Sequence, residues 1–203
     1  MDLMHLYVSE FVGSVILIFF GSSTGSSVLL KKTMASNFNA GWVPIVLGWG
    51  FAVAFGVYAA LGLGGPAHLN PAVTVAMAVM GTFPWSQVIP VIIVQIAGCF
   101  VGAGLTMLFY YPHFKITGPD EGNCVGIFAT GPAIDNRPFN FLSELLATFF
   151  FIFAILTLGK MSSGLFAIVL GFLVMSIGFS FGSVTGYAIN PSRDFGPRLA
   201  YEL

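Results

Sequence analysis

Two Asn-Pro pairs, Asn70-Pro71 and Asn190-Pro191, stand out in a sequence that is otherwise strongly apolar. Asparagine is a favoured helix N-cap and proline is favoured at the first helical position, so each pair predicts the start of a helix. The first predicted helix meets Gly81 and Pro84 after about three turns, and the second meets Gly196-Pro197 after fewer than about two. Neither helix is long enough to cross a bilayer.

The N-terminus of each half-helix would present unsatisfied N–H groups and the positive end of a helix macrodipole. Inside a membrane, such helix ends are tolerated only where they are buried in protein or line a watery cavity. Two positive ends that meet would repel cations, and the amides of Asn70 and Asn190 would donate hydrogen bonds to a passing oxygen. The asparagines could be helix caps alone, but as a pair they predict a passage for neutral solutes that excludes ions and protons.

Arg193 follows the second Asn-Pro pair. An arginine at membrane depth is energetically costly and is rarely retained there without a functional reason. Its alternative role is a structural ion pair with Asp194 or with a buried carboxylate. We expect Arg193 to face the path of the solute.

The sequence contains no pattern that is typical of a metal site, a redox site or a nucleic-acid-binding surface. His68 has no second His, Cys or carboxylate at ligand spacing, and Cys99 and Cys124 are two isolated cysteines. The formal net charge is -1 and the seven basic residues are scattered along the chain. We expect no metal, no cofactor and no nucleic-acid partner.

The composition predicts a membrane protein. Hydrophobic residues make up 57% of the chain and charged residues 7%, against roughly 25% charged in soluble domains, and the mean hydropathy is +0.93. The apolar runs predict five spans, at Val8 to about Leu30, Gly41 to about Leu63, Trp85 to Tyr111, Phe141 to about Leu158 and Gly164 to about Gly182. The first run could be misread as a secretory signal, but no basic region precedes it.

Between the third and fourth spans the composition turns polar. Residues at about 112–140 predict a long exposed loop, marked by Asp120, Glu121, Asn123, Asp135, Asn136 and Arg137. The loop separates similar halves, at about 1–111 and about 141–203, because Ser9-Glu10-Phe11 opens the first span as Ser143-Glu144-Leu145 opens the fourth. Three spans separate the repeats, so the halves should have opposite orientations across the membrane. The sequence predicts one channel domain, 1–203, built from an inverted repeat.

With these motifs the chain resembles the major intrinsic protein family, the aquaporins and aquaglyceroporins, and is most similar to bacterial glycerol facilitators. The resemblance implies an all-α transmembrane fold, an aquaporin-like right-handed helix bundle with inverted repeats and two re-entrant half-helices. It also implies a multi-pass protein of the bacterial plasma membrane and a homotetramer with one pore per subunit. The family has six spans and this sequence supplies five, so we expect it to be part of a longer chain.

The resemblance assigns pore residues by position. The two boxes are Asn70, Pro71 and Ala72, and Asn190, Pro191 and Ser192, in which Ser192 replaces the usual alanine and would add a hydroxyl near the midplane of the membrane, with a slight change in solute preference. The constriction would consist of Trp49, Gly178, Tyr187 and Arg193, a glycerol-type filter rather than a narrower water-type filter with a histidine. The assignment of Trp49 to the constriction depends wholly on this alignment, since a lone tryptophan more often packs against other helices or faces lipid. Tyr187 replaces the more usual phenylalanine, which would narrow the filter or favour carbonyl solutes.

Three further residues are expected to support the loops. Glu10 and Glu144 lie near the starts of apolar spans, where an ionised carboxylate must find partners. Proton relay and interfacial snorkelling are alternatives, but the resemblance implies that both carboxylates accept hydrogen bonds from the re-entrant loops. His68 is expected to orient its loop beside the pore.

The predicted function is a passive channel for glycerol and other small neutral solutes, with water, that excludes ions and protons. The alternatives are a channel mainly for water, or for small organic acids such as lactic acid, urea or peroxide. A secondary transporter is a weaker alternative, because no Asp, Lys or Arg pair lies within a span apart from Arg193. An enzyme is not expected, since no Ser/His/Asp or His-Glu zinc spacing falls within the spans.

Overall fold

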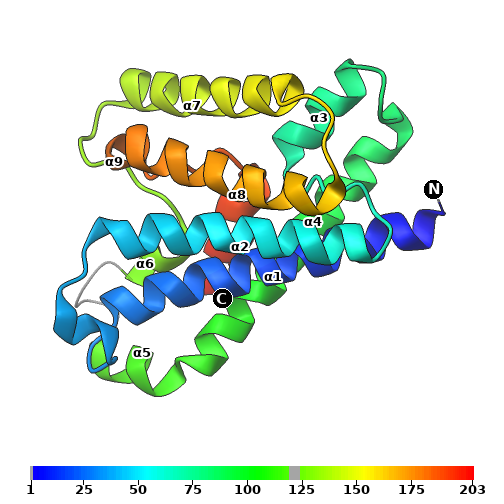
Figure 1. The fold of residues 1–203 in the computed structure, drawn as a ribbon. Helices are drawn as coiled ribbons and strands as arrows, with labels where there is room; N and C mark the ends of the chain where they lie inside the picture. Colours follow the sequence, from blue (N-terminus) through cyan, green and yellow to red (C-terminus); the bar gives the residue numbers. More distant parts are fainter. Residues whose placement is uncertain (1, 119–123) are drawn as a thin grey trace.

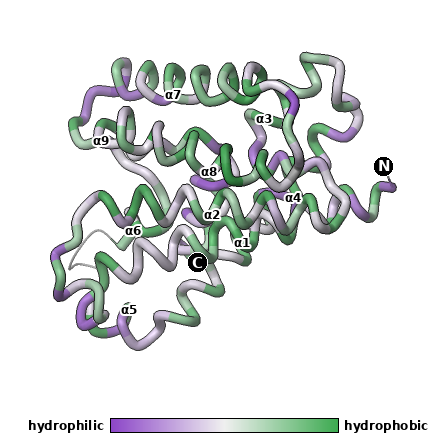
Figure 2. Tube along the Cα trace, in the orientation of Figure 1, coloured by the Kyte–Doolittle hydropathy of each residue, from purple (hydrophilic) through white to green (hydrophobic). Residues whose placement is uncertain are grey.

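The computed structural model describes residues 2–118 and 124–203, and the regular elements in these ranges are helices (Figure 1). Five of them are long and apolar: α1 (Leu3–Leu29), α2 (Trp42–Gly62), α4 (Val88–Phe109), α7 (Arg137–Thr157) and α8 (Ser163–Ser180). Four are long and apolar enough to cross a membrane, with α4 counted together with the 3-10 turn η2 (Trp85–Gln87), and α8 is shorter. Figure 2 shows α7 and α8 hydrophobic through most of their length.

The two halves run in opposite directions. In Figure 1, α1 and α7 cross the view in opposite senses, and so do α2 and α8. Each half also contains a half-helix, α3 (Pro71–Val79) in the first and α10 (Pro191–Glu202) in the second. This arrangement agrees with the inverted repeat that the sequence predicts.

Glycines allow the long helices to pack closely. Helix α1 packs against α2 and α4, and α2 packs against α8. A Cβ atom added at Gly98 of α4 would lie 2.5 Å from the Phe11 carbonyl oxygen, and one at Gly50 of α2 would lie 2.8 Å from the Gly171 carbonyl oxygen of α8. Apolar side chains gain little by leaving lipid for another helix, so small residues that let backbones approach are the usual contact between membrane helices.

Asn70 and Asn190 are the N-caps of α3 and α10, as predicted, and α3 ends just before Gly81. The prediction that the second half-helix stops at Gly196-Pro197 is wrong, because α10 has 12 residues and Pro197 lies inside it. A Cβ atom at Gly196 would lie 2.8 Å from the Cβ atom of Cys99 and 2.8 Å from the Ile96 carbonyl oxygen. This glycine therefore allows close packing on α4, and it does not end the helix.

The prediction of one long exposed loop at about 112–140 is also wrong. The segment contains α5 (Tyr111–Thr117) and α6 (Cys124–Phe128), and its last residues already belong to α7. Apolar side chains bury α6 against α1 and α10, and Phe128 is fully buried. The expected loop residues Asp120, Glu121 and Asn123 lie outside the described residues.

The remaining elements are short. The 3-10 turn η1 (Ala35–Phe38) follows α1, and α9 (Gly182–Thr185) follows α8. The third span ends at Phe109 rather than Tyr111, and the fourth begins at Arg137 rather than Phe141. Tyr110 and Tyr111 extend the apolar run past the end of α4, and α7 begins with the partly polar residues 137–140, so hydropathy alone could not place these boundaries.

Candidate functional site

The two half-helices meet through their capping asparagines. The Asn70 Nδ2 atom donates to the Ile189 carbonyl oxygen at 2.8 Å, and the Asn190 Nδ2 atom donates to the Leu69 carbonyl oxygen at 2.7 Å. Each Oδ1 atom caps its own helix, because Asn70 accepts from the Ala72 N–H at 2.8 Å and Asn190 accepts from the Ser192 N–H at 3.1 Å. The exchange is reciprocal, so each asparagine holds both its own helix and the opposite loop.

The two loops that precede the half-helices share a strained backbone. Ala67 and Leu69 have φ values of 56° and 51°, and Tyr187 and Ile189 both have φ values of 44°. Left-handed backbone costs an ordinary L-residue roughly 1–2 kcal/mol, so strong contacts must hold these conformations in place.

Two carboxylates provide such contacts, Glu10, which is fully buried, and Glu144, which is partly buried. Glu10 accepts from the backbone N–H groups of His68 and Leu69, both at 2.7 Å, and from Gln95 Nε2 at 2.8 Å. Glu144 accepts from Thr185 Oγ1 at 2.6 Å, and from the backbone N–H groups of Ala188 and Ile189 at 3.1 and 3.2 Å. Hydrogen bonds to an ionised acceptor are roughly twice as strong as neutral ones, which suits a carboxylate that restrains strained backbone.

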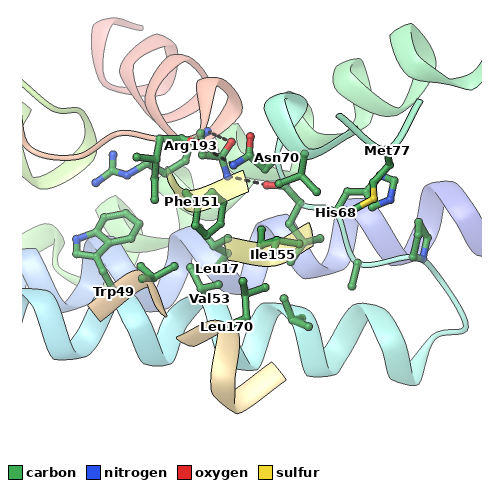
Figure 3. A pocket seen from close by; sticks show the side chains of 18 of the residues that line it. Leu17, Trp49, Val53, His68, Asn70, Met77, Phe151, Ile155, Leu170 and Arg193 are labelled. Carbon is green, nitrogen blue, oxygen red and sulfur yellow. Dashed lines mark hydrogen bonds between the residues drawn. The ribbon is translucent and has the colours of Figure 1, made fainter. Parts of the chain in front are cut away.

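Between the loops lies a cavity of about 310 Å³ (Figure 3). Its lining residues with polar side chains are Asn70, Asn190, Arg193, His68, Thr82 and Tyr187, and residues 67–69 and 187–189 all line it. Much of the rest of the wall is formed by apolar side chains, which are Leu17, Val53, Val57, Val73, Met77, Phe151, Ile155, Phe166, Leu170 and Val174. In Figure 3, Trp49 and Arg193 lie toward one end of the cavity, and His68 and Met77 lie toward the other.

Arg193 is held at its end of the cavity by two contacts. Its Cζ atom lies 3.8 Å from the centroid of the Trp49 ring, and its Nη1 atom donates to the Phe128 carbonyl oxygen at 3.0 Å. Asp194, its expected alternative partner, instead pairs with Arg198 at 3.1 Å. The guanidinium therefore has donors left for a solute at the cavity wall.

Tyr187 completes this end of the cavity, and Gly178 lies behind it. A Cβ atom at Gly178 would lie 2.9 Å from Tyr187 Cζ and 3.1 Å from its hydroxyl oxygen. The Tyr187 ring also meets Trp42 edge-on at 5.9 Å, and Trp42 Nε1 donates to the Gly178 carbonyl oxygen at 3.2 Å. The space that Gly178 leaves is thus occupied by the tyrosine, while Trp49, Tyr187 and Arg193 line the cavity.

The other residues of the two boxes do not line the cavity. Pro71 and Pro191 occupy the first positions of α3 and α10, and Ala72 receives the Asn70 cap. The Ser192 hydroxyl, which was expected near the midplane, is fully buried and donates to Asn190 Oδ1 at 2.8 Å. Of the six box residues, Asn70 and Asn190 line the cavity.

His68 lines the cavity and is oriented by its neighbours. Its Nδ1 atom lies 3.2 Å from Thr74 Oγ1, and its ring meets Phe83 edge-on at 4.9 Å. Gln95 Nε2, which also binds Glu10, donates to the same threonine oxygen at 3.0 Å. Within residues 2–118 and 124–203, no three His, Cys, Asp or Glu side chains gather in a way that could hold a metal ion.

Sequence reasoning missed the apolar wall and the carbonyl that holds Arg193. Phe151 and Ile155 on α7, and Phe166, Leu170 and Val174 on α8, recur at a four-residue spacing that is typical of one helix face. The long helices are apolar on all sides, however, so this spacing does not distinguish the cavity face from the lipid face. Phe128 lies in a segment that was expected to be an exposed loop.

Comparisons with known proteins agree with this arrangement. The chain is 50% identical to glycerol uptake facilitator protein 2 of Lactiplantibacillus plantarum, over 98% of this chain and 85% of that protein. It is 46% identical to a probable glycerol uptake facilitator protein of Thermotoga maritima, with the same coverage, and 35% identical to a D/L-lactic acid transporter of Lactiplantibacillus plantarum, over 99% of this chain and 83% of that protein.

Among solved structures, the fold is similar to the aquaglyceroporin from Plasmodium falciparum. The TM-score is 0.85 at 27% identity, over 98% of this chain and 81% of that one. The family model described as "Major intrinsic protein" matches residues 1–203. The chain therefore belongs to the major intrinsic protein family.

Proposed function

We propose that this chain forms a passive membrane channel for glycerol and other small neutral solutes, together with water, and that it excludes ions and protons. The observation that carries the proposal is the division of the cavity wall into donors and apolar side chains. Asn70, Asn190 and Arg193 can donate to hydroxyl oxygens, while side chains such as Leu17 and Phe151 face the carbons. A polyol matches both parts of the wall, because its hydroxyls bind the donors and its carbons contact the apolar side chains. Water has no carbons to contact the apolar side chains.

Cation exclusion follows from the fixed charges and dipoles. The N-termini of α3 and α10 meet at the reciprocal asparagine contact, and each carries roughly half a positive charge. Arg193 adds a full positive charge at the cavity wall. A hydronium or sodium ion would lose its hydration without gaining a compensating anion, so neutral solutes pass more easily than cations.

The names of the relatives support glycerol as the solute. The two Lactiplantibacillus and Thermotoga proteins named glycerol uptake facilitators share 46–51% identity with this chain, while the lactic acid transporter shares 35%. As the assembly we propose a homotetramer in a bacterial plasma membrane, with one pore per subunit.

The test is stopped-flow light scattering on proteoliposomes that contain the complete gene product. A glycerol gradient measures solute flux and a sucrose gradient measures water flux. We expect fast glycerol re-swelling that is linear in concentration and insensitive to pH and sodium gradients. Fast water flux with glycerol excluded would instead indicate a water channel, and faster flux of protonated lactic acid would indicate an acid channel.

Arg193→Ala provides the matched variant for this test. Removing the guanidinium takes away a donor and a positive charge from the cavity wall, so we expect larger polyols and cations to leak while the protein remains folded. Selectivity equal to that of the wild type for polyols, protons and sodium would show that Arg193 is not part of the filter.

A further inference from the structure

Three residues near the Arg193 end of the cavity form a connected cluster, Thr130, Asp194 and Arg198, called here the outer clamp. Asp194 Oδ1 accepts from the Thr130 N–H at 2.6 Å and from the Thr130 hydroxyl at 3.0 Å. Asp194 Oδ2 accepts from Arg198 Nη2 at 3.1 Å, and the same nitrogen donates to the Thr130 carbonyl oxygen at 2.9 Å. The threonine is thus held through its N–H, its hydroxyl and its carbonyl.

The outer clamp lies next to the filter in both segments that it joins. Asp194 follows Arg193 directly in α10, and Thr130 lies two residues after Phe128, whose carbonyl oxygen accepts from Arg193 Nη1 at 3.0 Å. Movement of the Thr130 backbone would therefore move the acceptor that places the guanidinium over Trp49.

The segment that precedes Tyr187 packs against the same threonine. Gly186 has a φ value of +89°, and a Cβ atom built there would lie 2.8 Å from Thr130 Cβ. The Ala133 N–H also donates to the Val184 carbonyl oxygen at 2.9 Å. Thr130 consequently lies between α10 and the segment that leads to Tyr187, the aromatic wall of the filter.

We propose that Thr130, Asp194 and Arg198 are positioning residues for the filter, and that the outer clamp sets solute selectivity through the Phe128 carbonyl and Arg193. This inference rests on the proposed function, because selectivity among polyols presupposes that polyols pass. When the clamp is released, the guanidinium loses its fixed acceptor and samples more positions. Larger polyols are then excluded less strongly, and glycerol loses a well-oriented donor.

The experiment compares ribitol, glycerol and water permeability in proteoliposomes that contain the full protein. Thr130→Val removes the hydroxyl at nearly constant shape and keeps the N–H contact, while Thr130→Ser retains the hydroxyl and removes only the methyl group. Asp194→Ala removes both sides of the clamp. The control is Thr117→Val in α5, which removes another threonine hydroxyl between α4 and α7, one that donates to the His113 carbonyl at 2.8 Å and accepts from the Lys31 N–H at 2.9 Å.

The ratio of ribitol to glycerol permeability is the decisive readout, because a fold defect lowers the number of active channels and leaves this ratio unchanged. We expect the ratio to rise about threefold in Thr130→Val and about tenfold in Asp194→Ala, and to stay near the wild-type value in Thr130→Ser. Thr117→Val should keep the wild-type ratio.

Unchanged ratios in both Thr130→Val and Asp194→Ala would overturn the inference, even if every flux fell. The proposed function fails separately, if wild-type vesicles conduct no more glycerol than empty ones. In that case the outer clamp is judged on the ratio of urea to water permeability in the same set of variants.

Discussion

At the scale of single residues, the side-chain amide of each capping asparagine faces three partners: its own helix, the opposite loop and the cavity. The Asn70 oxygen caps α3, one N–H bonds to the Ile189 carbonyl, and the cavity lies beside the group. Asn190 repeats this pattern with Leu69. An amide has two N–H donors, so the bond to the opposite loop leaves one donor for a solute oxygen. Alanine could provide neither the cap nor the donor.

Gly178→Ala tests how closely Tyr187 is packed. The new Cβ atom would lie 2.9 Å from Tyr187 Cζ, so the ring must move away from α8 and toward the cavity that it lines. Overpacking of about 1–3 kcal/mol at this end of the cavity corresponds to a roughly tenfold fall in glycerol permeability, with a smaller loss for water.

The matched control for this prediction is Gly164→Ala, on the same helix, where no atom lies within 4 Å of the added Cβ. Both variants are compared with the wild type by stopped-flow light scattering. Glycerol flux that is equal in Gly178→Ala and Gly164→Ala would show that Tyr187 is free to move without narrowing the pore.

Glu10→Gln tests the support of the first loop. The wild-type carboxylate is fully buried and accepts three hydrogen bonds at 2.7–2.8 Å. In the glutamine variant, the side-chain NH2 group would face one of these hydrogen-bond donors. Loss of charged hydrogen bonds in a buried site should lower the free energy of unfolding by about 2–3 kcal/mol. Thermal unfolding in mild detergent measures this loss.

Glu144→Gln serves as the comparison. Its carboxylate is only partly buried and accepts bonds at 2.6–3.2 Å, so its midpoint of unfolding should fall less than that of Glu10→Gln. The reverse order would mean that the second loop depends more on its glutamate than the contacts indicate.

At the scale of helices, backbone contacts at glycines decide how closely the long helices pack. Gly98 of α4 meets the backbone of α1, and Gly50 and Gly171 bring α2 and α8 together. Helix α7 is different, because Ala147 and Phe151 are its only buried residues among those the structure describes. Its packing therefore depends on the few residues that contact α8, α9 and α3.

Gly98→Ala should destabilise the protein strongly. The added Cβ atom would lie 2.5 Å from the Phe11 carbonyl oxygen, a backbone atom that cannot rotate away, so α1 and α4 must separate. We expect a loss of about 1–3 kcal/mol or more, measured as a lower unfolding midpoint in detergent.

Gly104→Ala lies on the same helix and meets nothing within 4 Å. It should be neutral or stabilising by up to about 1 kcal/mol, because alanine is the better helix former. Equal unfolding midpoints for the Gly98 and Gly104 variants would contradict the close approach of α1 and α4.

At the scale of the whole molecule, the outer surface is dominated by large apolar side chains. Exposed examples on α7 include Phe141, Phe149, Phe150 and Phe153, and α2 contributes Phe51 and Phe55. Such a surface suits lipid or another subunit. The outer face of α1 and α2 also bears a groove whose lining includes Ser23, Thr24 and Ser27. Hydroxyls of this kind are more often found where helices meet than where they face lipid tails.

The homotetramer predicts a specific mass. Native mass measurement of the complete protein in mild detergent should give four times the monomer mass, with detergent and lipid subtracted. A single species of monomer mass would contradict the proposed assembly, while the pore within each subunit would remain testable by flux.

The sequence by itself determined the half-helices, their caps and the inverted repeat. These features are local or periodic: Asn-Pro specifies a helix start through one side chain and one ring, and the repeated Glu10 and Glu144 segments reveal the duplication without any long-range contact. The apolar composition likewise determined that the protein folds in a membrane, because so few charged residues cannot form the surface of a soluble protein.

Only the tertiary structure decided which apolar face lines the cavity. The long helices are apolar on every side, so hydropathy could not separate the wall at Phe151 and Ile155 from the lipid surface. Nor could it show that Gly178 makes room for Tyr187, that Gly196 packs on α4 inside a longer helix, or that the Phe128 carbonyl holds Arg193. Each of these depends on segments far apart in the chain coming within contact distance, and close packing between helices, unlike capping, leaves no local pattern in the sequence.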